Sequence, residues 1–226
     1  AYPTEIGFST DGTKCFYLRN SNDSVYHATL STPFDISTLN NVLAYSVTGY
    51  NPNPRGIWVK EDGMSFMVVG TSSDRVYQWN LSSAWDLSSG VSVVSTSLYV
   101  GSQASSPNSM DFNSDGTKLY VIDYSGNIYQ YGLTAGFNIS TASYDSVTSG
   151  QLSTTDCMGM RFNSDGTKIF IQRAAGPVET YNLSPAYDIT SATLDSGATW
   201  TTGLTGVWGI SFSPSGHYVY LGDNSN

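Results

Sequence analysis

Residues 112–134 read FNSDGTKLYVIDYSGNIYQYGLT, and residues 162–184 read FNSDGTKIFIQRAAGPVETYNLS. In both stretches an Asp-Gly pair is followed by a strand-like run, a polar interruption and a second strand-like run. The Asp-Gly pair recurs about every 50 residues, and self-similarity at such a period indicates a repeat architecture. The markers are Asp11-Gly12, Asp62-Gly63, Asp115-Gly116, Asp165-Gly166 and the variant Ser215-Gly216.

Further landmarks keep a constant order within each repeat. Apolar residues stand three and five positions before every marker, which is the period of two of a strand. A run after the marker reads VYHATLS (25–31), VYQWNLS (76–82), IYQYGLT (128–134) and VETYNLS (178–184). An aromatic-Asp element follows as FDIS (34–37), WDLS (85–88), FNIS (137–140) and YDIT (187–190), with Asn in place of Asp once.

Each repeat predicts four antiparallel strands. In the third repeat the first strand ends with MDF (110–112), and the Asp-Gly turn leads into a second strand, KLYVID (118–123). A polar reversal at 124–127 precedes the third strand, IYQYGL (128–133), and ASYDSV (142–147) supplies a less regular fourth strand. Because no window keeps the 3.6-residue period of an amphipathic helix, the repeat is predicted to be a four-stranded meander.

The apolar residues of these inner strands lie on both faces of the predicted sheet. Stacking such sheets around an axis buries both faces, so the fold class is predicted to be an all-β propeller with blades of about 50 residues. A solenoid of four-stranded repeats is the alternative. The aromatic-Asp element is expected at the blade periphery in a structural role, with its ring packed on the blade and its carboxylate or amide holding a turn.

The chain contains four complete repeats and half of a fifth. After Gly216 a second strand reaches Asp223, and no third-strand or aromatic-Asp element follows. We expect the missing half blade to come from the rest of a longer chain of five to eight blades, or otherwise from a partner chain. The prediction is a single domain, 1–226, with repeats at about 1–50, 51–103, 104–153 and 154–203 and a partial repeat at 204–226.

These repeats resemble tandem DGTK-type propeller repeats. The residues that carry the resemblance are FSTDGTKCFYLRNSNDSVYHATLSTPFDIS, WVKEDGMSFMVVGTSSDRVYQWNLSSAWDLS and the two stretches quoted first, each extended to its aromatic-Asp element. Such arrays occur in bacterial cell-surface or secreted proteins and in tail or appendage proteins of bacteriophages, notably marine ones. The resemblance therefore implies a propeller at an extracellular, cell-surface or virion location. The Gly-His pair and the Trp-Asp ending do not recur in these repeats as they do in WD40 repeats.

The composition argues against two classes of partner. The formal net charge is −9, whereas nucleic-acid binding needs a basic surface and anionic membranes attract basic ones. No run of eighteen apolar residues occurs, so no membrane insertion is expected. The two cysteines, Cys15 and Cys157, occupy different repeat positions and are interpreted as separate buried thiols, which leaves the redox compartment open.

Catalytic and metal-binding motifs are sparse in the sequence. His27 and His217 occupy different repeat positions, and neither has a companion that would complete a zinc site or a catalytic triad. The glycine-rich segment 203–209 lacks the lysine and the strand-to-helix context of a phosphate-binding loop. The repeated Asp-Gly pairs invite a calcium interpretation, but turn formation explains them more simply. We therefore expect no cofactor and no enzymatic activity.

The most variable segments are the connections between blades, at 46–56, 100–109, 148–159 and 196–209. In a propeller these connections gather on one face around the channel mouth, and this face is predicted to bind a glycan or a protein. The alternative is that its aromatic residues only fill the loops. Further in, Asp111 and Arg161 occupy the same position in neighbouring blades and are expected to form a salt bridge. The candidate ligand-binding residues are Tyr50, Arg55, Asn108, Trp200 and Trp208, and the varied positions seven residues before the markers also include Thr4 and Met158.

Three functions are consistent with these observations. The first is a non-enzymatic binding or structural module, an extracellular or virion-appendage component that contacts a glycan or a protein. The second is a propeller enzyme, such as a lyase or lactonase, with its site at the channel mouth. The third is a purely structural spacer. A propeller supports all three, so the fold alone does not choose between them.

Overall fold

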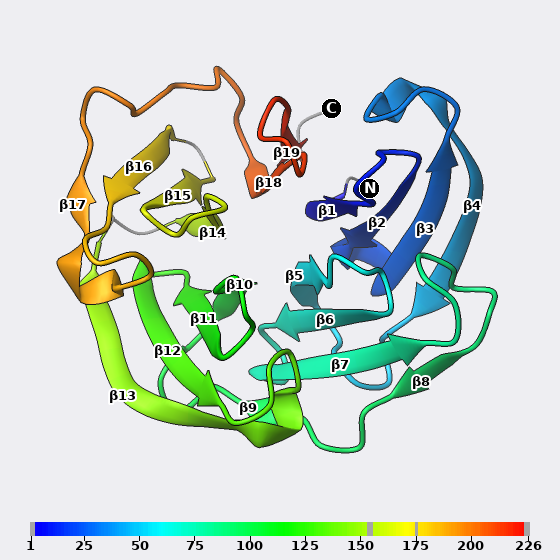
Figure 1. Cartoon of the computed structure of the whole chain (residues 1–226), viewed down its shortest axis with the longest axis horizontal. Coiled ribbons are helices and arrows are strands. Elements are labelled where there is room, and N and C mark those ends of the chain that lie inside the picture. Colours follow the sequence, from blue (N-terminus) through cyan, green and yellow to red (C-terminus); the bar gives the residue numbers. More distant parts are fainter. Residues whose placement is uncertain (1–2, 153–155, 175, 224–226) are drawn as a thin grey trace.

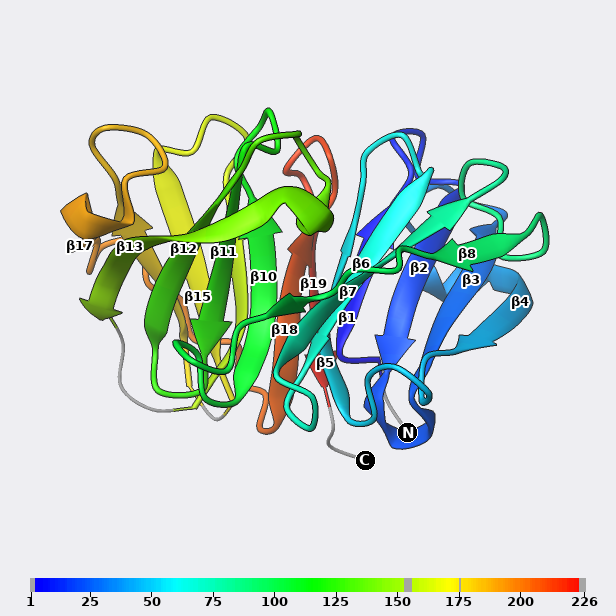
Figure 2. The same cartoon turned by 90° about the horizontal axis from the view of Figure 1, so that it is seen from below.

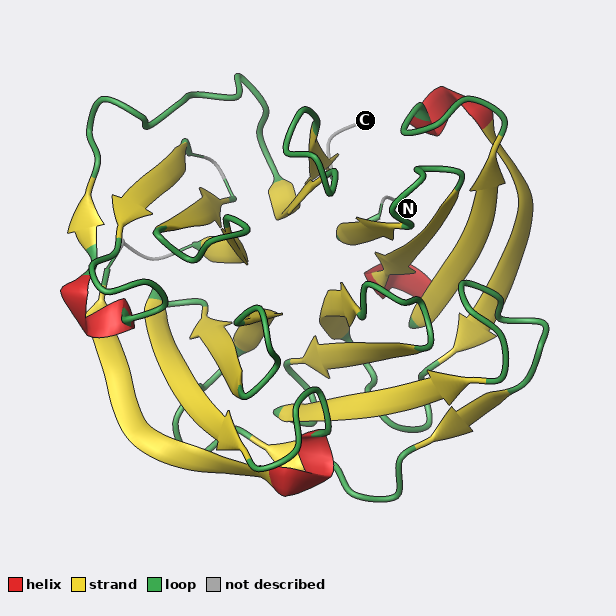
Figure 3. Cartoon of the chain, viewed as in Figure 1, coloured by secondary structure: helices red, strands yellow, loops and turns green. Residues whose placement is uncertain are grey.

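The computed structural model describes residues 3–152, 156–174 and 176–223. Antiparallel sheets surround a central axis, as Figure 1 shows, and the few helices are single turns (Figure 3). Four of the sheets are the blades of a β-propeller, and a small two-stranded sheet accompanies them. The predicted all-β propeller fold is confirmed.

The strands follow one another within each sheet in chain order. Blade 1 contains β1 (Glu5–Phe8), β2 (Lys14–Arg19), β3 (Ser24–Leu30) and β4 (Leu39–Ser46). Blade 2 contains β5 (Pro54–Val59), β6 (Ser65–Gly70), β7 (Arg75–Leu81), β8 (Val91–Val93) and β9 (Leu98–Tyr99). Blade 3 contains β10 (Pro107–Phe112), β11 (Lys118–Asp123), β12 (Asn127–Leu133) and β13 (Ala142–Gln151). Blade 4 contains β14 (Cys157–Phe162), β15 (Lys168–Arg173), β16 (Val178–Asn182) and β17 (Thr193–Leu194), and the two-stranded sheet contains β18 (Val207–Phe212) and β19 (Val219–Asp223).

The fourth strands are less uniform than the repeat pattern predicts. In blade 2 two short strands, β8 and β9, both pair with β7 in place of one continuous strand. In blade 4 the outer strand is reduced to β17, and Trp200 forms an isolated bridge with Val178. The outermost strand has one sheet neighbour and contacts water on its other edge, so its pairing is the least constrained.

The aromatic-Asp element has the predicted structural role. In blades 1, 3 and 4 it forms a turn of 3₁₀-helix after the third strand, namely η2 (Ile36–Thr38), η3 (Ile139–Thr141) and η4 (Ile189–Ser191). A separate turn, η1 (Asn20–Asn22), lies between β2 and β3. The Asn138 side chain accepts a hydrogen bond from the Ser140 amide at 3.1 Å and caps η3. The Phe137 amide donates to the Gly116 carbonyl at 3.0 Å, so the aromatic residue covers the Asp-Gly turn of its own blade.

Gly116 shows why these turns require glycine. Its φ is +71°, a left-handed conformation, and a Cβ atom there would lie 2.5 Å from the Phe137 ring. The Asp115 carboxylate accepts hydrogen bonds from the Thr117 amide (2.9 Å) and hydroxyl (2.6 Å), and these bonds lower the pKa of Asp115. The turn chemistry accounts for the repeated aspartates without a bound cation.

The hydrophobic core consists of separate clusters between neighbouring sheets. Phe16 of blade 1 and Phe66 and Trp79 of blade 2 belong to one cluster, and equivalent clusters join blades 2 and 3 and blades 3 and 4. A fourth cluster in blade 1 includes Tyr220 of β19 among its packed residues. Apolar side chains are therefore buried between neighbouring blades, as the sequence pattern predicts.

The two-stranded sheet closes the ring of inner strands. Strands β1, β5, β10, β14 and β18 contact one another in that order, and β18 also contacts β1. The approach of β18 to β1 requires glycine, because a Cβ atom on Gly209 would lie 2.0 Å from the Thr4 carbonyl oxygen. The partial repeat had no predicted neighbour, and the structure places it between blades 4 and 1 (Figures 1 and 2).

Candidate functional site

Equivalent positions of the five inner strands form layers around the axis. The outermost of these layers, which we call the mouth ring, contains the residues seven positions before each marker. They lie at or just before the beginning of the inner strands, on the face opposite the Asp-Gly turns. The mouth ring consists of Thr4, Arg55, Asn108, Met158 and Trp208.

Arg55 and Trp208 are brought together across the mouth ring. The Arg55 guanidinium carbon lies 4.6 Å from the centroid of the Trp208 ring, and both side chains are half-buried. Their strands, β5 and β18, flank β1, so the contact joins blades that are not adjacent. Burial lowers the pKa of Arg55, and its Nε has no hydrogen-bond partner within the described chain. The pair combines an aromatic face with an unused N–H donor.

Asn108 is already engaged by the protein. Its side chain is buried, and the Nδ2 atom donates to the Cys157 carbonyl at 2.8 Å and contacts the Met158 sulfur at 3.7 Å. Thr4 is also buried and donates to the Leu18 carbonyl at 3.4 Å. Arg55, Met158 and Trp208 are therefore the partly exposed members of the mouth ring.

Tyr50 and Trp200 lie apart from the Arg55–Trp208 pair. The Tyr50 ring packs edge-on against Tyr77 and Trp79 of β7, which is the third strand of blade 2. Trp200 pairs through its backbone with Val178 of β16, in the position of an outer strand of blade 4. The sequence analysis predicted both residues near the mouth ring because their loops belong to the face that carries this ring. In the structure the loops lead Tyr50 and Trp200 to the third strands.

A buried charged cluster lies deeper, one and three positions closer to the markers than the mouth ring, and we call it the central cluster. Glu5 reaches it from β1, Ser109 and Asp111 from β10, and Arg161 from β14. The Glu5 carboxylate accepts from the Ile57 amide at 2.7 Å and from the Ser109 hydroxyl at 2.8 Å, and it forms an ion pair with Arg161 at 3.2 Å.

Arg161 and Asp111 complete this network. Arg161 donates to the carbonyls of Met110 (2.7 Å), Met160 (3.0 Å) and Ile57 (2.9 Å). The Asp111 carboxylate accepts from the Trp58 indole at 3.1 Å and from the amides of Phe112 (2.9 Å) and Phe162 (2.8 Å). The expected Asp111–Arg161 salt bridge is wrong, because the guanidinium is directed to Glu5 while backbone and indole N–H groups satisfy Asp111.

Burial shapes the protonation of both carboxyl groups. It raises the pKa of Glu5 to about 7, and Arg161 and the hydrogen bonds from Ser109 and Ile57 limit the rise. Burial also raises the pKa of Asp111. Glu5 was missed in the sequence, although a signal existed: the equivalent positions in the other repeats are Gly56, Ser109, Gly159 and Gly209. A single long side chain among small ones fills the space at the axis.

The remaining chemistry-bearing residues do not converge. His27 is buried beside Phe16, both of its ring nitrogens lack hydrogen-bond partners in the described chain, and burial lowers its pKa. His217 is exposed in the last Asp-Gly-type turn. Cys15 and Cys157 are buried in β2 and β14, and burial raises the pKa of Cys15 to about 12. Among the described residues, no three His, Cys, Asp or Glu side chains are grouped to hold a metal, and no helix is both long and apolar enough to span a bilayer.

Comparisons with known proteins support the fold. No protein-family model matches the chain. No curated protein matches it either. Among solved structures, a provisionally named 6-phosphogluconolactonase from Bacteroides uniformis aligns over 97% of this chain and 62% of its own, with a TM-score of 0.57 and 12% identity. A protein of unknown function from Desulfotomaculum acetoxidans aligns over 98% of this chain and 65% of its own (TM-score 0.58, 12% identity).

A third similar structure is a provisionally named 6-phosphogluconolactonase from Bacteroides fragilis, with a TM-score of 0.57 and 16% identity. It aligns over 94% of this chain and 61% of its own. The chain thus spans less than two thirds of the length of each of these structures. At these identities the likeness extends to the fold, and the protein has a β-propeller fold similar to these structures.

Proposed function

We propose that the chain is a non-enzymatic binding or structural β-propeller module that contacts a glycan or a protein partner at the mouth ring. The observation that carries the proposal is the Arg55–Trp208 pair. A half-exposed indole offers a face for the C–H groups of a sugar ring or for an apolar side chain, and the guanidinium N–H groups offer donors to hydroxyl or carbonyl oxygens.

In this proposal the central cluster is the floor of the binding site and not a second reactive group. Glu5 and Asp111 each accept hydrogen bonds from protein donors on both carboxylate oxygens. A carboxylate with this many N–H and O–H partners is held in one orientation. A ligand at the mouth would meet Arg55, Met158 and Trp208 above a fixed layer.

The resemblance to DGTK-type repeats leads us to propose an extracellular, cell-surface or virion location, with bacteriophage tail or appendage proteins among the candidates. The net charge of −9 supports a soluble surface without affinity for nucleic acid. Detection of the natural protein in purified virions or in a surface fraction tests the location directly.

Binding is tested by a glycan array probed with the wild type and with Trp208→Ala. Tyr99→Ala is a matched control, because Arg75 lies 5.1 Å from the centroid of the Tyr99 ring at the edge of blade 2. We expect glycan signals that Trp208→Ala reduces at least tenfold and Tyr99→Ala retains. Absence of any glycan or protein ligand for the folded wild type would contradict recognition and favour a structural spacer.

A propeller lactonase is the second candidate, favoured by the names of two similar structures. It predicts turnover of 6-phosphogluconolactone above the rate of its spontaneous hydrolysis. If the protein accelerates this hydrolysis and Arg55→Ala lowers the rate, the mouth ring is a reaction site and the non-enzymatic proposal fails.

A further inference from the structure

His27 is a buried titratable side chain that belongs neither to the mouth ring nor to the central cluster. It lies in β3, the third strand of blade 1, and is 6% exposed. Its Nδ1 and Nε2 atoms are both buried, and neither has a hydrogen-bond partner in the described chain. A neutral imidazole carries one N–H donor and one acceptor nitrogen, so the described chain satisfies neither polar group of this ring.

The equivalent side chains of the other three blades are hydrogen-bonded and are not titratable. They are Gln78, Gln130 and Thr180, at the third position of the runs VYQ, IYQ and VET. Gln78 accepts from the Ile139 amide of the next blade at 3.1 Å. Gln130 and Thr180 donate to acceptors of their own blades at 2.8 Å and 2.9 Å. Blade 1 therefore departs from the other blades by placing a titratable ring without partners at this position.

The His27 ring lies at the junction between blades 1 and 2. It packs edge-on against Phe16, with 5.6 Å between the ring centroids. Phe16 in turn packs edge-on against Phe66 and Trp85 of blade 2, at 5.8 Å and 5.4 Å. These three aromatic side chains are buried. A charged imidazolium at this place would lose its hydration without gaining an acceptor from the rings, which is unfavourable.

Only one strand separates His27 from water. In the strand register Phe16 of β2 lies opposite His27 on the inner side, and Leu43 of β4 lies opposite it on the outer side. Leu43 is 41% exposed, and the β3–β4 ladder is irregular between His27 and Thr29. β4 is the outermost strand of blade 1 and has one sheet neighbour (Figure 1). Displacement of β4 would therefore bring His27 into contact with water and leave the ring of inner strands intact.

Burial dominates the electrostatics of His27. It lowers the pKa of the imidazole below its ordinary value. Asp86, in the aromatic-Asp element of blade 2, acts in the opposite direction, whereas Lys14 of β2 adds to the effect of burial. These are the charged groups that act on His27 among the described residues. Asp86 is held by its own turn, since it accepts from the Ser88 amide at 2.8 Å and hydroxyl at 2.6 Å.

We propose that the junction between blades 1 and 2 is an acid-sensitive switch, in which protonation of His27 displaces β4 and opens the outer half of the junction. At neutral pH the uncharged ring packs on Phe16 and the junction is closed. In acid both ring nitrogens carry N–H groups, and water supplies the acceptors that the closed junction does not. The proposal concerns the outer part of one junction, so it does not depend on the proposed function of the mouth ring.

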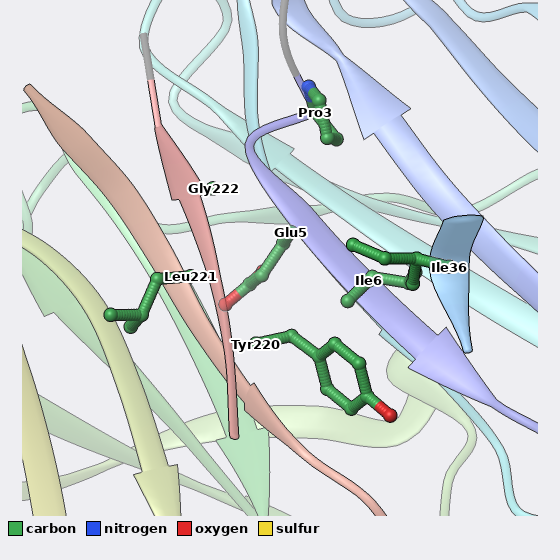
Figure 4. Close-up of a pocket in the computed structure, with 7 residues that line it drawn as sticks. All are labelled: Pro3, Glu5, Ile6, Ile36, Tyr220, Leu221 and Gly222. Carbon is green, nitrogen blue, oxygen red and sulfur yellow. The ribbon is translucent and has the colours of Figure 1, made fainter. Parts of the chain in front are cut away.

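A second buried group responds to pH in the opposite sense. Glu5 lines a pocket of about 50 Å³ between β19 and blade 1 (Figure 4). Burial raises the pKa of Glu5 to about 7, so acid stabilises the native state through Glu5. The stability that depends on neutral His27 is present above pH 6.5 and is lost as the pH falls through the lowered pKa of this residue. Variants of His27 that retain Glu5 separate the two contributions.

Hydrogen exchange at pH 7.5 and pH 5.0, corrected for the intrinsic exchange rate of each amide, tests the switch. In the wild type we expect the protection of the amides of β3 and β4 to fall about tenfold at pH 5.0, because local opening exposes them. Protection of β11 and β12 in blade 3 should not fall. Return to pH 7.5 should restore the protection of β3 and β4, since the opening requires only a proton.

Replacing His27 by the residue of another blade isolates its effect. His27→Gln copies Gln78 and Gln130, and His27→Thr copies Thr180, so the experiment remains informative if one of the two variants does not fold. In either folded variant we expect the protection of β3 and β4 to change less than about twofold between the two pH values. His217→Gln is the matched control, because His217 is the other histidine of the chain and is exposed in the last Asp-Gly-type turn. It should keep the acid response of the wild type.

Four results would overturn the proposal. The first is unchanged protection of β3 and β4 in the wild type at pH 5.0. The second is an equal acid response of the wild type and the folded His27 variants, which would assign the response to another group. The third is an equal loss of protection in blade 3, which would indicate global unfolding. The fourth is an NMR titration in which the pKa of His27 lies at or above its ordinary value.

Discussion

Two junctions of the propeller use the same inner contacts and differ in their outer halves. Between blades 3 and 4, the Tyr120 hydroxyl donates to the Tyr187 carbonyl at 2.9 Å. Between the two-stranded sheet and blade 1, the Tyr220 hydroxyl donates to the Phe34 carbonyl at 2.8 Å. Both donors occupy the same position of a second strand, and both acceptors are the aromatic residue of the next blade. The second junction is therefore a true blade interface on its inner side.

The outer halves differ because, among the described residues, only the first junction has a third strand. Ile128 of β12 belongs to the buried cluster between blades 3 and 4, whereas the corresponding space beside Gly222 is a pocket. The comparison teaches that two strands are enough to close the inner ring, while burial of the outer apolar positions needs the third strand.

The largest expected effect comes from the inner ring that both junctions share. Arg161→Ala would leave Glu5 buried without its cation and remove three hydrogen bonds to carbonyls, and we expect the free energy of unfolding to fall by about 3–5 kcal/mol. Lys168→Ala, which breaks the exposed pair with Asp195, should lower it by less than about 1 kcal/mol. Urea denaturation measures both, and equal losses would show that the central cluster does not hold the ring.

The second prediction compares the junction between blades 3 and 4, the covered junction, with the junction between the two-stranded sheet and blade 1, the open junction. Ile189→Ala removes a buried side chain between blades 3 and 4 and should lower the free energy of unfolding by about 2–4 kcal/mol. Ile36→Ala, at the equivalent place beside the two-stranded sheet, should lower it by about 0.5 kcal/mol or less because the side chain is half in water. A loss of 2 kcal/mol at Ile36 would mean that the protein itself covers this position in solution.

The Asp-Gly turns provide a smaller contrast. Gly116→Val forces a β-branched residue into a positive φ and against the Phe137 ring, so we expect a loss of roughly 2 kcal/mol or more. Gly216→Val meets the same backbone strain at φ +72° without a ring nearby and should lose about 1 kcal/mol. Thermal melting of both variants tests the difference, and neither should selectively remove ligand binding. An unchanged melting temperature of Gly116→Val would contradict the assigned turn.

The smallest effect is the pH dependence contributed by Glu5, which lines the pocket at the open junction. Its pKa is raised from 4.5 to about 7, so the native state retains a proton that the unfolded state releases. The stability that Glu5 contributes in this way is complete below about pH 4.5 and is lost as the pH rises through 7. As the pH falls from 8 to 6, the free energy of unfolding of the wild type should rise by about 1 to 1.5 kcal/mol relative to that of Glu5→Gln. A difference that grows toward pH 8 would give the opposite sign and refute the raised pKa.

Much of each blade was predictable because it depends on neighbouring strands. The strands expected at 118–123 and 128–133 correspond to β11 and β12 within one residue. The Asp-Gly hinge and the aromatic-Asp element were identified from their recurrence, and both act on residues of their own repeat. Fourth strands were predicted less well, since their pairing with one neighbour tolerates the split β8 and β9 and the short β17.

The candidate site was predictable only in part. Arg55, Asn108 and Trp208 do lie in one layer, because a constant offset from the marker places equivalent residues at the same height. Tyr50 and Trp200 belong to connections of irregular length, and no periodic pattern records where such a loop runs. Glu5 was overlooked because its role depends on partners contributed by blades 2, 3 and 4.

The sequence by itself determined the repeat, the alternation of buried side chains and the turns, because these follow from contacts between residues close along the chain. Only the tertiary structure decided how many inner strands close the ring, that Arg161 pairs with Glu5 and that Arg55 meets Trp208. The physical reason is that contacts across the axis depend on the number of sheets around it and the angle between them.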